Sequence, residues 1–136
     1  SSGSIELGST DKLSRAQQLV AEGKVLEAIK TYDAVLEDDP DNPEALAQRG
    51  WLLRNAGLVD EGLTYIDRAI AADPAYADAH FFKGMILWRD KGDAAAAVPE
   101  LQAFLAGTPS AQEAAQVEEL LRQAQAEAGT TTVPQR

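Results

Sequence analysis

The chain contains no cysteine and only one histidine. The missing cysteine excludes disulfides, thiolate nucleophiles and zinc–thiolate sites, and it leaves the redox compartment open. The single histidine, His80, falls at a packing position and is interpreted as a core or edge residue. No HExxH, G-x-S-x-G or phosphate-binding glycine loop is present. We therefore expect no enzyme, no catalytic residue, no metal site and no cofactor.

Positive charge is also scarce. The sequence has 12 Lys and Arg against 22 Asp and Glu, a net charge of −10. Nucleic-acid binding needs a basic face, and an anionic membrane surface repels an acidic domain. No apolar run approaches the roughly 20 residues of a membrane-spanning helix. We expect no nucleic-acid partner and no membrane insertion of this fragment, whereas a basic partner segment is compatible with the charge.

What the sequence does contain is an internal repeat. Three landmarks recur with spacings of 34 and then 35 residues: a closing proline, a mid-unit glycine, and a small residue five places after that glycine. They fall at Pro40, Pro74 and Pro109, at Gly23, Gly57 and Gly92, and at Ala28, Gly62 and Ala97. Since all three markers drift by the same single residue, the chain is a repeat protein. The extra residue of the third unit lies between Gly84 and Gly92.

Abundant alanine and few β-branched residues favour helices throughout. Asn42 and Pro43 suit the N-cap and first position of one helix, and Ser110 with Glu113 forms a capping-box pattern that opens the last helix. Side-chain oxygens from residues 9–11 are available to cap the first helix. Pro99 predicts a late start or a kink in the helix expected over residues 94–106.

A helix–turn–helix unit of this length with these landmarks resembles the tetratricopeptide repeat (TPR), over about Ser9 to Pro109. The resemblance implies an all-α fold, a right-handed α-solenoid of three helix pairs plus a C-terminal capping helix. It also implies close approach of Gly50 to Gly62 and of Gly84 to Ala97. The expected organisation is a cloning scar or disordered segment over 1–8, a TPR domain over 9–129 (repeats 9–42, 43–76 and 77–109, capping helix 110–128) and a disordered tail over 130–136.

In this family the first helices of successive units line a concave groove. The matching positions here give a candidate peptide-binding site, formed by Gln48, Trp51, Arg54, Asn55, Phe81, Phe82, Met85, Trp88 and Arg89. The five apolar members would anchor a partner, and Arg54, Asn55 and Arg89 would orient it; ordinary salt bridges are the alternative for the two arginines. Phe81, Met85 and Trp88 form a second apolar stripe beside that of His80, Gly84 and Leu87. Such a stripe either packs in the core or binds a partner.

The lysines and asparagines with which some TPR domains hold a chaperone carboxylate are missing. Gln17, Gln48 and Trp51 stand where asparagines would be, and Leu13 and Asp78 stand where lysines would be. Chaperone-tail recognition is therefore not expected, and the groove suits an apolar or aromatic segment of a protein partner.

We therefore predict a non-enzymatic protein–protein interaction domain. A weaker resemblance to soluble TPR domains of bacterial cell-envelope and cytochrome c maturation factors rests on the short array followed by residues 113–121. It suggests a scaffold for an envelope assembly complex, within a larger anchored protein; otherwise the domain is expected in the cytoplasm. The alternative is a homo-oligomer that buries the same aromatic face. A small-ligand or enzyme role would require an enclosed pocket with perturbed carboxylates.

Overall fold

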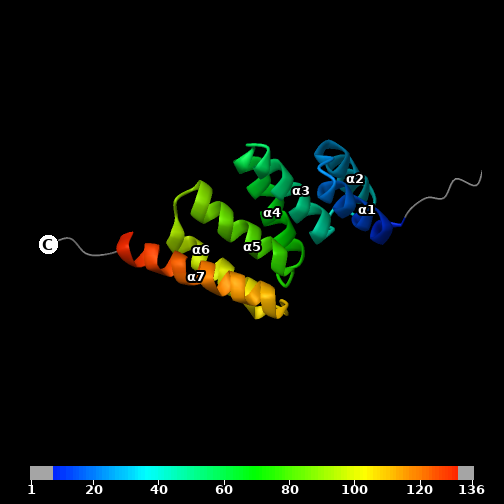
Figure 1. Ribbon diagram of the computed structural model, residues 1–136. Coiled ribbons are helices and arrows are strands. Elements are labelled where there is room, and N and C mark those ends of the chain that lie inside the picture. Colours follow the sequence, from blue (N-terminus) through cyan, green and yellow to red (C-terminus); the bar gives the residue numbers. More distant parts are fainter. Residues whose placement is uncertain (1–7, 132–136) are drawn as a thin grey trace, which may run out of the picture.

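The computed structural model describes residues 8–131, and in that part of the chain every regular element is helical. Figure 1 shows successive helical hairpins that run from the blue N-terminal pair to the red C-terminal helix. The elements are α1 (Ser9–Ala21), α2 (Val25–Asp38), α3 (Pro43–Asn55), α4 (Val59–Ala72), α5 (Ala77–Met85), η1 (Ile86–Asp90), α6 (Ala94–Ala106) and α7 (Ala111–Thr131).

The helices pack as three pairs with a final helix added at the end. α1 packs on α2, α3 on α4, and α5 on α6, while α2 on α3 and α4 on α5 join consecutive pairs. α7 covers α6. The buried residues form three apolar clusters, and the first two draw members from neighbouring pairs. Each unit is thus stabilised by the next, as in a solenoid, and the predicted α-solenoid with a capping helix is confirmed.

Local chemistry sets the helix starts. Asn42 Oδ1 accepts a hydrogen bond from the Ala45 N–H at 2.9 Å, with Pro43 as the first helical residue. The Glu113 N–H donates to Ser110 Oγ at 3.1 Å and the Ser110 N–H donates to Glu113 Oε1 at 3.0 Å, which is the predicted capping box. The prediction that a side chain from residues 9–11 caps the first helix was wrong, because residue 9 is already helical and Gly8 occupies the N-cap position.

The repeat glycines fall into two physical classes. The mid-unit glycines Gly23, Gly57 and Gly92 have φ of 79°, 95° and 70°, a left-handed conformation that disfavours side chains. Gly50 and Gly62 instead allow backbones to touch, since a Cβ on Gly50 would lie 2.6 Å from the Gly62 carbonyl oxygen. The predicted approach of these two glycines is confirmed.

The close approach predicted for Gly84 has different neighbours. A Cβ placed on Gly84 would first meet Leu101 Cδ2 at 3.2 Å and Glu100 Cβ at 3.3 Å, both from α6. Ala97 was the expected contact, but the three nearest atoms belong to Leu101 and Glu100. The helices still approach closely here, but Gly84 faces a later turn of α6 than the repeat register predicts.

The extra residue of the third unit forms a π turn. α5 passes without a break into η1, where the Lys91 N–H donates to the Ile86 carbonyl at 3.0 Å, a bond that spans five residues. A π turn holds one residue more than an α turn and is the usual way a helix absorbs an insertion. The predicted insertion between Gly84 and Gly92 is confirmed, and it lies inside the helix.

Pro99 does not delay α6. The helix begins at Ala94, five residues earlier, and Asp93 Oδ1 caps it by accepting from the Ala96 N–H at 3.0 Å. The late start was wrong because this cap and a run of four alanines favour helix before the proline.

At the C-terminal end, α7 continues to Thr131, past the predicted start of the tail at Thr130; residues 1–7 and 132–136 lie outside the described part. Within that part, no helix combines the length and the apolarity needed to cross a bilayer.

Candidate functional site

The first helix of each pair, together with α7, contributes to one continuous surface, which we call the groove face. Gln17 of α1 donates from Nε2 to Glu44 Oε2 of α3 at 2.6 Å. Trp51 of α3 stacks on Phe82 of α5, with ring centroids 4.6 Å apart and an interplanar angle of 11°. α5 and α7 in turn line a shared cavity. The repeat therefore brings α1, α3, α5 and α7 next to one another along this face.

An aromatic cluster forms the centre of the groove face. Phe81 meets Phe82 edge-on at 6.2 Å and lies tilted against Phe104 of α6 at 5.7 Å. Phe82 is buried, with 9% of its surface exposed, whereas Trp51 and Phe81 are half-buried. The inner ring thus holds two outer rings that retain exposed apolar surface, and the offset geometry of such pairs fixes their orientation.

A cavity of about 270 Å³ opens beside this cluster, between α5 and α7. A neighbouring hollow of about 280 Å³ lies toward the ends of α4 and α6 and shares Asp78, Phe104 and Glu113 with the first. The first cavity is lined by Asp78, Phe81, Phe82, Phe104, Glu113, Gln116, Val117 and Leu120. Its floor is apolar, and its two ionisable groups are both carboxylates.

These carboxylates belong to a series that follows the repeat. Glu44, Asp78 and Glu113 occupy equivalent positions in the first turns of α3, α5 and α7, spaced by 34 and 35 residues. Burial raises the pKa of Asp78, and the charge of Glu113 raises it further. Burial likewise raises the pKa of Glu44, with Asp78 adding to the effect and the Gln17 hydrogen bond opposing it. The groove face is therefore locally acidic.

Gln48 lies next to this series. Its Nε2 donates to the Tyr76 hydroxyl at 3.4 Å, and that hydroxyl donates to Asp78 Oδ2 at 3.5 Å. Burial raises the pKa of Tyr76, so the phenol stays protonated and can act as this donor. Gln48 is half-buried on the groove face, where it links α3 to the start of α5.

The stripe of Phe81, Met85 and Trp88 does not stay on one face. Phe81 borders the cavity, while Met85 is half-buried against the C-terminal core cluster. Trp88 is only 3% exposed and donates from Nε1 to Glu127 Oε1 of α7 at 2.9 Å. Because η1 adds one residue to the turn, positions beyond Met85 rotate away from the register of a continuous α-helix. Trp88 consequently packs under α7.

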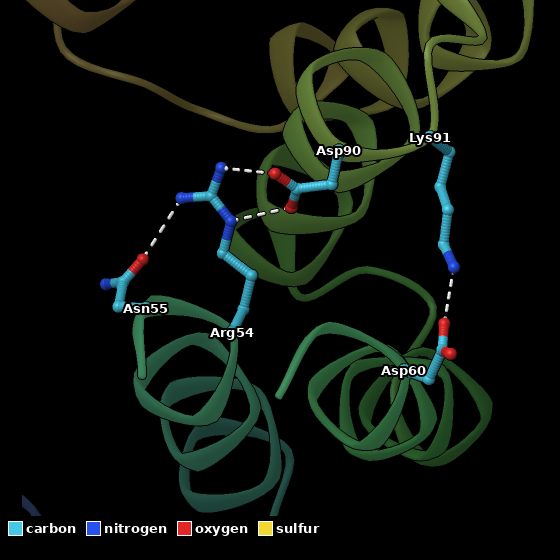
Figure 2. A network of polar contacts seen from close by, with 5 residues as sticks. All are labelled: Arg54, Asn55, Asp60, Asp90 and Lys91. Carbon is cyan, nitrogen blue, oxygen red and sulfur yellow. Dashed lines mark hydrogen bonds and ion pairs between the residues drawn. The ribbon is translucent and has the colours of Figure 1, made fainter. Parts of the chain in front are cut away.

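Two of the candidate polar residues are already bonded within the protein (Figure 2). Arg54 donates from Nε and Nη2 to the two Asp90 oxygens at 2.7 and 2.9 Å, and from Nη1 to Asn55 Oδ1 at 3.0 Å. Its guanidinium also lies 4.7 Å from the centroid of Trp51. The bond to Asp90 raises the pKa of Arg54. The ordinary salt bridge considered for this arginine is what the structure shows.

Figure 2 also shows a second ion pair between the same two units, Lys91 with Asp60. Together with the pair of Arg54 and Asp90, it ties η1 and the following turn to α3 and α4. Arg89, the other candidate arginine, is exposed, and its guanidinium lies 3.8 Å from the centroid of the Trp88 ring.

His80 holds the third unit together and is turned away from the cavity. Its Nδ1 lies 2.8 Å from Glu100 Oε1, and its Nε2 lies 2.7 Å from the Pro74 carbonyl oxygen. Both nitrogens are thus used between α5, α6 and the preceding turn. Within residues 8–131, no group of three His, Asp or Glu side chains is arranged to hold a metal ion.

Sequence reasoning missed part of the site. Phe104, Val117 and Leu120 line the cavity but lie on α6 and α7, and their periodicity alone indicates only apolar helix faces. Asp78 was noted only as a departure from lysine. The series it forms with Glu44 and Glu113 shares the drift of the glycines and prolines, and that spacing could have revealed it.

Comparisons with known proteins agree with this geometry. The family model described as tetratricopeptide repeat matches residues 13–77 and 47–112. A probable UDP-N-acetylglucosamine–peptide N-acetylglucosaminyltransferase SPINDLY from Hordeum vulgare is 33% identical over 101 residues, which cover 74% of this chain and 11% of that protein.

Two solved structures show the same fold. The TPR domain of P58(IPK) has a TM-score of 0.75 and 25% identity, with 86% of this chain and 32% of that chain covered. The first TPR of Spaghetti (RPAP3), bound to the HSP90 peptide SRMEEVD, has a TM-score of 0.73 and 20% identity, with 87% and 95% covered. The chain thus spans about a tenth of the barley protein and about a third of the P58(IPK) chain.

Proposed function

The chain belongs to the tetratricopeptide repeat family, and from that premise we propose that it binds a peptide or helix of a partner protein on its groove face. TPR domains are protein–protein interaction modules, and their fold is a scaffold without catalytic machinery. One solved relative of the fold holds a peptide. The scaffold role in a bacterial cell-envelope complex stays a prediction.

The observation that carries the proposal is the cavity beside the exposed edge of the aromatic cluster. At about 270 Å³ it lies just below the roughly 300–1,000 Å³ typical of small-molecule pockets, and it is partly open to solvent. That size suits one or two side chains of a bound segment better than a whole cofactor. Its apolar floor and the half-buried Trp51 beside it match the aromatic-rich centres of protein interfaces.

The candidate residues then divide into two roles. Gln48, Trp51, Phe81 and Met85 keep exposed surface on or beside the groove face, and we assign them to partner contact. Phe82, Trp88, Arg54, Asn55 and Arg89 are assigned to holding that surface in place, through the stack, the α7 contact and the polar network. We also assign the three carboxylates of the groove face to partner contact: Glu44, Asp78 and Glu113.

Self-association on the same face remains the alternative. Two copies would bring two chains of net charge −10 together with their groove carboxylates facing each other, and like charges at an interface oppose binding. This favours a different partner over a second copy. Sedimentation at several protein concentrations separates the two: a monomer at all concentrations excludes the dimer.

The test is selection of peptides from a random-sequence library on the wild-type domain, followed by calorimetry. Trp51→Ala combined with Phe81→Ala should weaken the selected peptides by more than about 1 kcal/mol, as hot-spot aromatics do. Tyr65→Ala is the matched control, because Tyr65 is also a half-buried aromatic with stacked arginines but lies on α4. Equal losses in the control, or selected peptides that ignore both changes, would refute groove binding.

A further inference from the structure

The groove carries a preference that the family fold does not specify. Resting on the proposed function, we propose that the occupant is a basic amphipathic segment. One of its Lys or Arg side chains lies between Asp78 and Glu113, and a neighbouring apolar side chain fills the cavity against Phe81 and Phe104. The class of partner is thus a cationic peptide or helix with apolar residues beside its charges.

The placement of the two carboxylates supports the cationic part. Asp78 and Glu113 stand at the border between the two hollows, on the first turns of α5 and α7. They are close enough for the charge of Glu113 to act on Asp78, and Asp78 acts in turn on Glu44. A row of repelling carboxylates is stabilised by a cation placed between its members, since an opposite charge offsets both the repulsion and part of the cost of burial.

These carboxylates lack the cationic partners that other acidic residues have. Asp33, Asp60, Asp67 and Asp90 each form an ion pair with a Lys or Arg from another helix or turn. No Lys or Arg in the described range forms such a pair with any member of the groove row, and the residues around the cavity include none. Their hydrogen-bond donors are neutral groups: the Gln17 amide for Glu44, the Tyr76 hydroxyl for Asp78 and the Ser110 N–H for Glu113. The groove therefore offers carboxylates whose negative charge an incoming cation can still neutralise.

Helix capping accounts for part of this row, in which Glu113 is exposed, but not for the partial burial of the other two members. Glu113 uses one oxygen to accept from the Ser110 N–H, and acidic residues in a first turn favour a helix. Glu61, in the first turn of α4, also favours its helix in this way, but it is exposed. Asp78 and Glu44 stay half-buried on the groove face, where carboxylates are costly unless a partner completes them.

The apolar part follows from the cavity itself. Phe81, Phe104, Val117 and Leu120 give it an apolar floor next to the carboxylates. A ligand with charged groups alone would leave the apolar floor exposed to water, and a purely apolar ligand would bury the carboxylates without a cation to pair with them. Only a segment that alternates the two kinds of side chain satisfies both, and the groove thereby selects against acidic segments.

The experiment uses three synthetic peptides that share one Leu and Phe framework and carry Lys, Gln or Glu at all polar positions. Their affinities are measured by calorimetry for the wild type and for three double variants. Asp78→Asn with Glu113→Gln removes the groove charges while Gln can maintain the capping box. Glu61→Gln with Glu118→Gln is the matched control, since it makes the same change in net charge at exposed positions. Trp51→Ala with Phe81→Ala removes the apolar contacts.

We expect the Lys peptide to bind the wild type most tightly and the groove-charge variant to bind it about tenfold more weakly, with the control pair unchanged. The inference is overturned if the Gln or Glu peptide binds as tightly as the Lys peptide, or if both charge variants lose affinity equally. In those cases loss of binding in the Trp51 and Phe81 variant would still uphold the proposed function. If no peptide binds, or none depends on those two residues, both proposals fail.

Discussion

The two tryptophans differ sharply in burial, and replacing each by alanine should separate core from groove. Trp88 is 3% exposed, packs from η1 against α6 and α7, and donates a hydrogen bond to Glu127. Trp51 is half-buried; its ring stacks on Phe82, and the Arg54 guanidinium lies 4.7 Å from the ring centroid. Since a register without the π turn would place both on the groove face, this comparison tests the effect of η1 directly.

The expected magnitudes follow from these contacts. Removing a fully buried large aromatic costs about 3–5 kcal/mol, a large share of the roughly 5–15 kcal/mol by which a domain is stable. Trp51→Ala loses one stacked pair and about half the burial, so we expect a cost of about 1–2 kcal/mol. Trp88→Phe keeps the ring packing but removes the donor to Glu127, which should cost about 1 kcal/mol.

The assay is urea unfolding followed by far-ultraviolet circular dichroism, with free energies extrapolated to water. Peptide affinity measured on the same variants provides the second readout. We expect Trp88→Ala to lower the free energy of unfolding strongly, and Trp51→Ala to lower peptide affinity with a smaller loss of stability. A Trp88→Ala protein that keeps its full stability but loses peptide binding would refute the placement of Trp88 in the core.

Three further changes test other parts of the structure. Gly62→Ala should destabilise the domain by about 1–3 kcal/mol, because its new Cβ would collide with the Gly50 carbonyl oxygen. The control is Gly129→Ala on α7, where a Cβ meets nothing within 4 Å. Equal urea midpoints for the two variants would contradict the close approach of Gly50 and Gly62. A double-mutant cycle on Arg54→Met and Asp90→Asn should give a coupling of about 1 kcal/mol, measured by urea unfolding, and zero coupling would mean that the pair does not join the units. Burial raises the pKa of Asp78 above its ordinary 3.8, so the folded state binds the carboxyl proton more tightly than the unfolded state does. The Asp78 contribution to stability is therefore constant below the pKa of the unfolded state and falls as pH rises through the pKa of the folded state. Asp78→Asn should remove that slope from a profile of stability against pH, and identical profiles for the variant and the wild type would contradict the burial effect.

The repeat spacing, together with the family resemblance that it supports, was sufficient to predict the architecture. The recurrence of Gly23, Gly57 and Gly92 marked the middle of each unit, where the structure has turns with left-handed backbone, and Asn42 with Pro43 predicted a helix start that the hydrogen bonds confirm. These features depend on neighbours in the sequence, where one residue type satisfies one local geometry. The repeat length then determined how the helix pairs stack.

The side chains of the third unit could not be placed in the same way. A helical wheel assumes a constant rotation per residue, and η1 violates it where Trp88 begins to diverge from Met85. The burial of Trp88 also depends on α7 and Glu127, which lie 39 residues further along the chain. The bond of Arg54 to Asp90 spans 36 residues and joins two units. Such contacts depend on how two helices dock, which periodicity within one helix does not describe.

The most direct test of peptide binding on the groove face uses the indole N–H signals of the protein in a nuclear magnetic resonance titration. The chain has only two tryptophans, so one signal reports the groove and the other the core. On addition of the Lys peptide, we predict that the Trp51 signal shifts until it saturates. The Trp88 signal should not shift, because its indole N–H donates to Glu127 of α7 in the core. A saturating peptide that leaves Trp51 unmoved, or shifts Trp88 alone, would contradict the account.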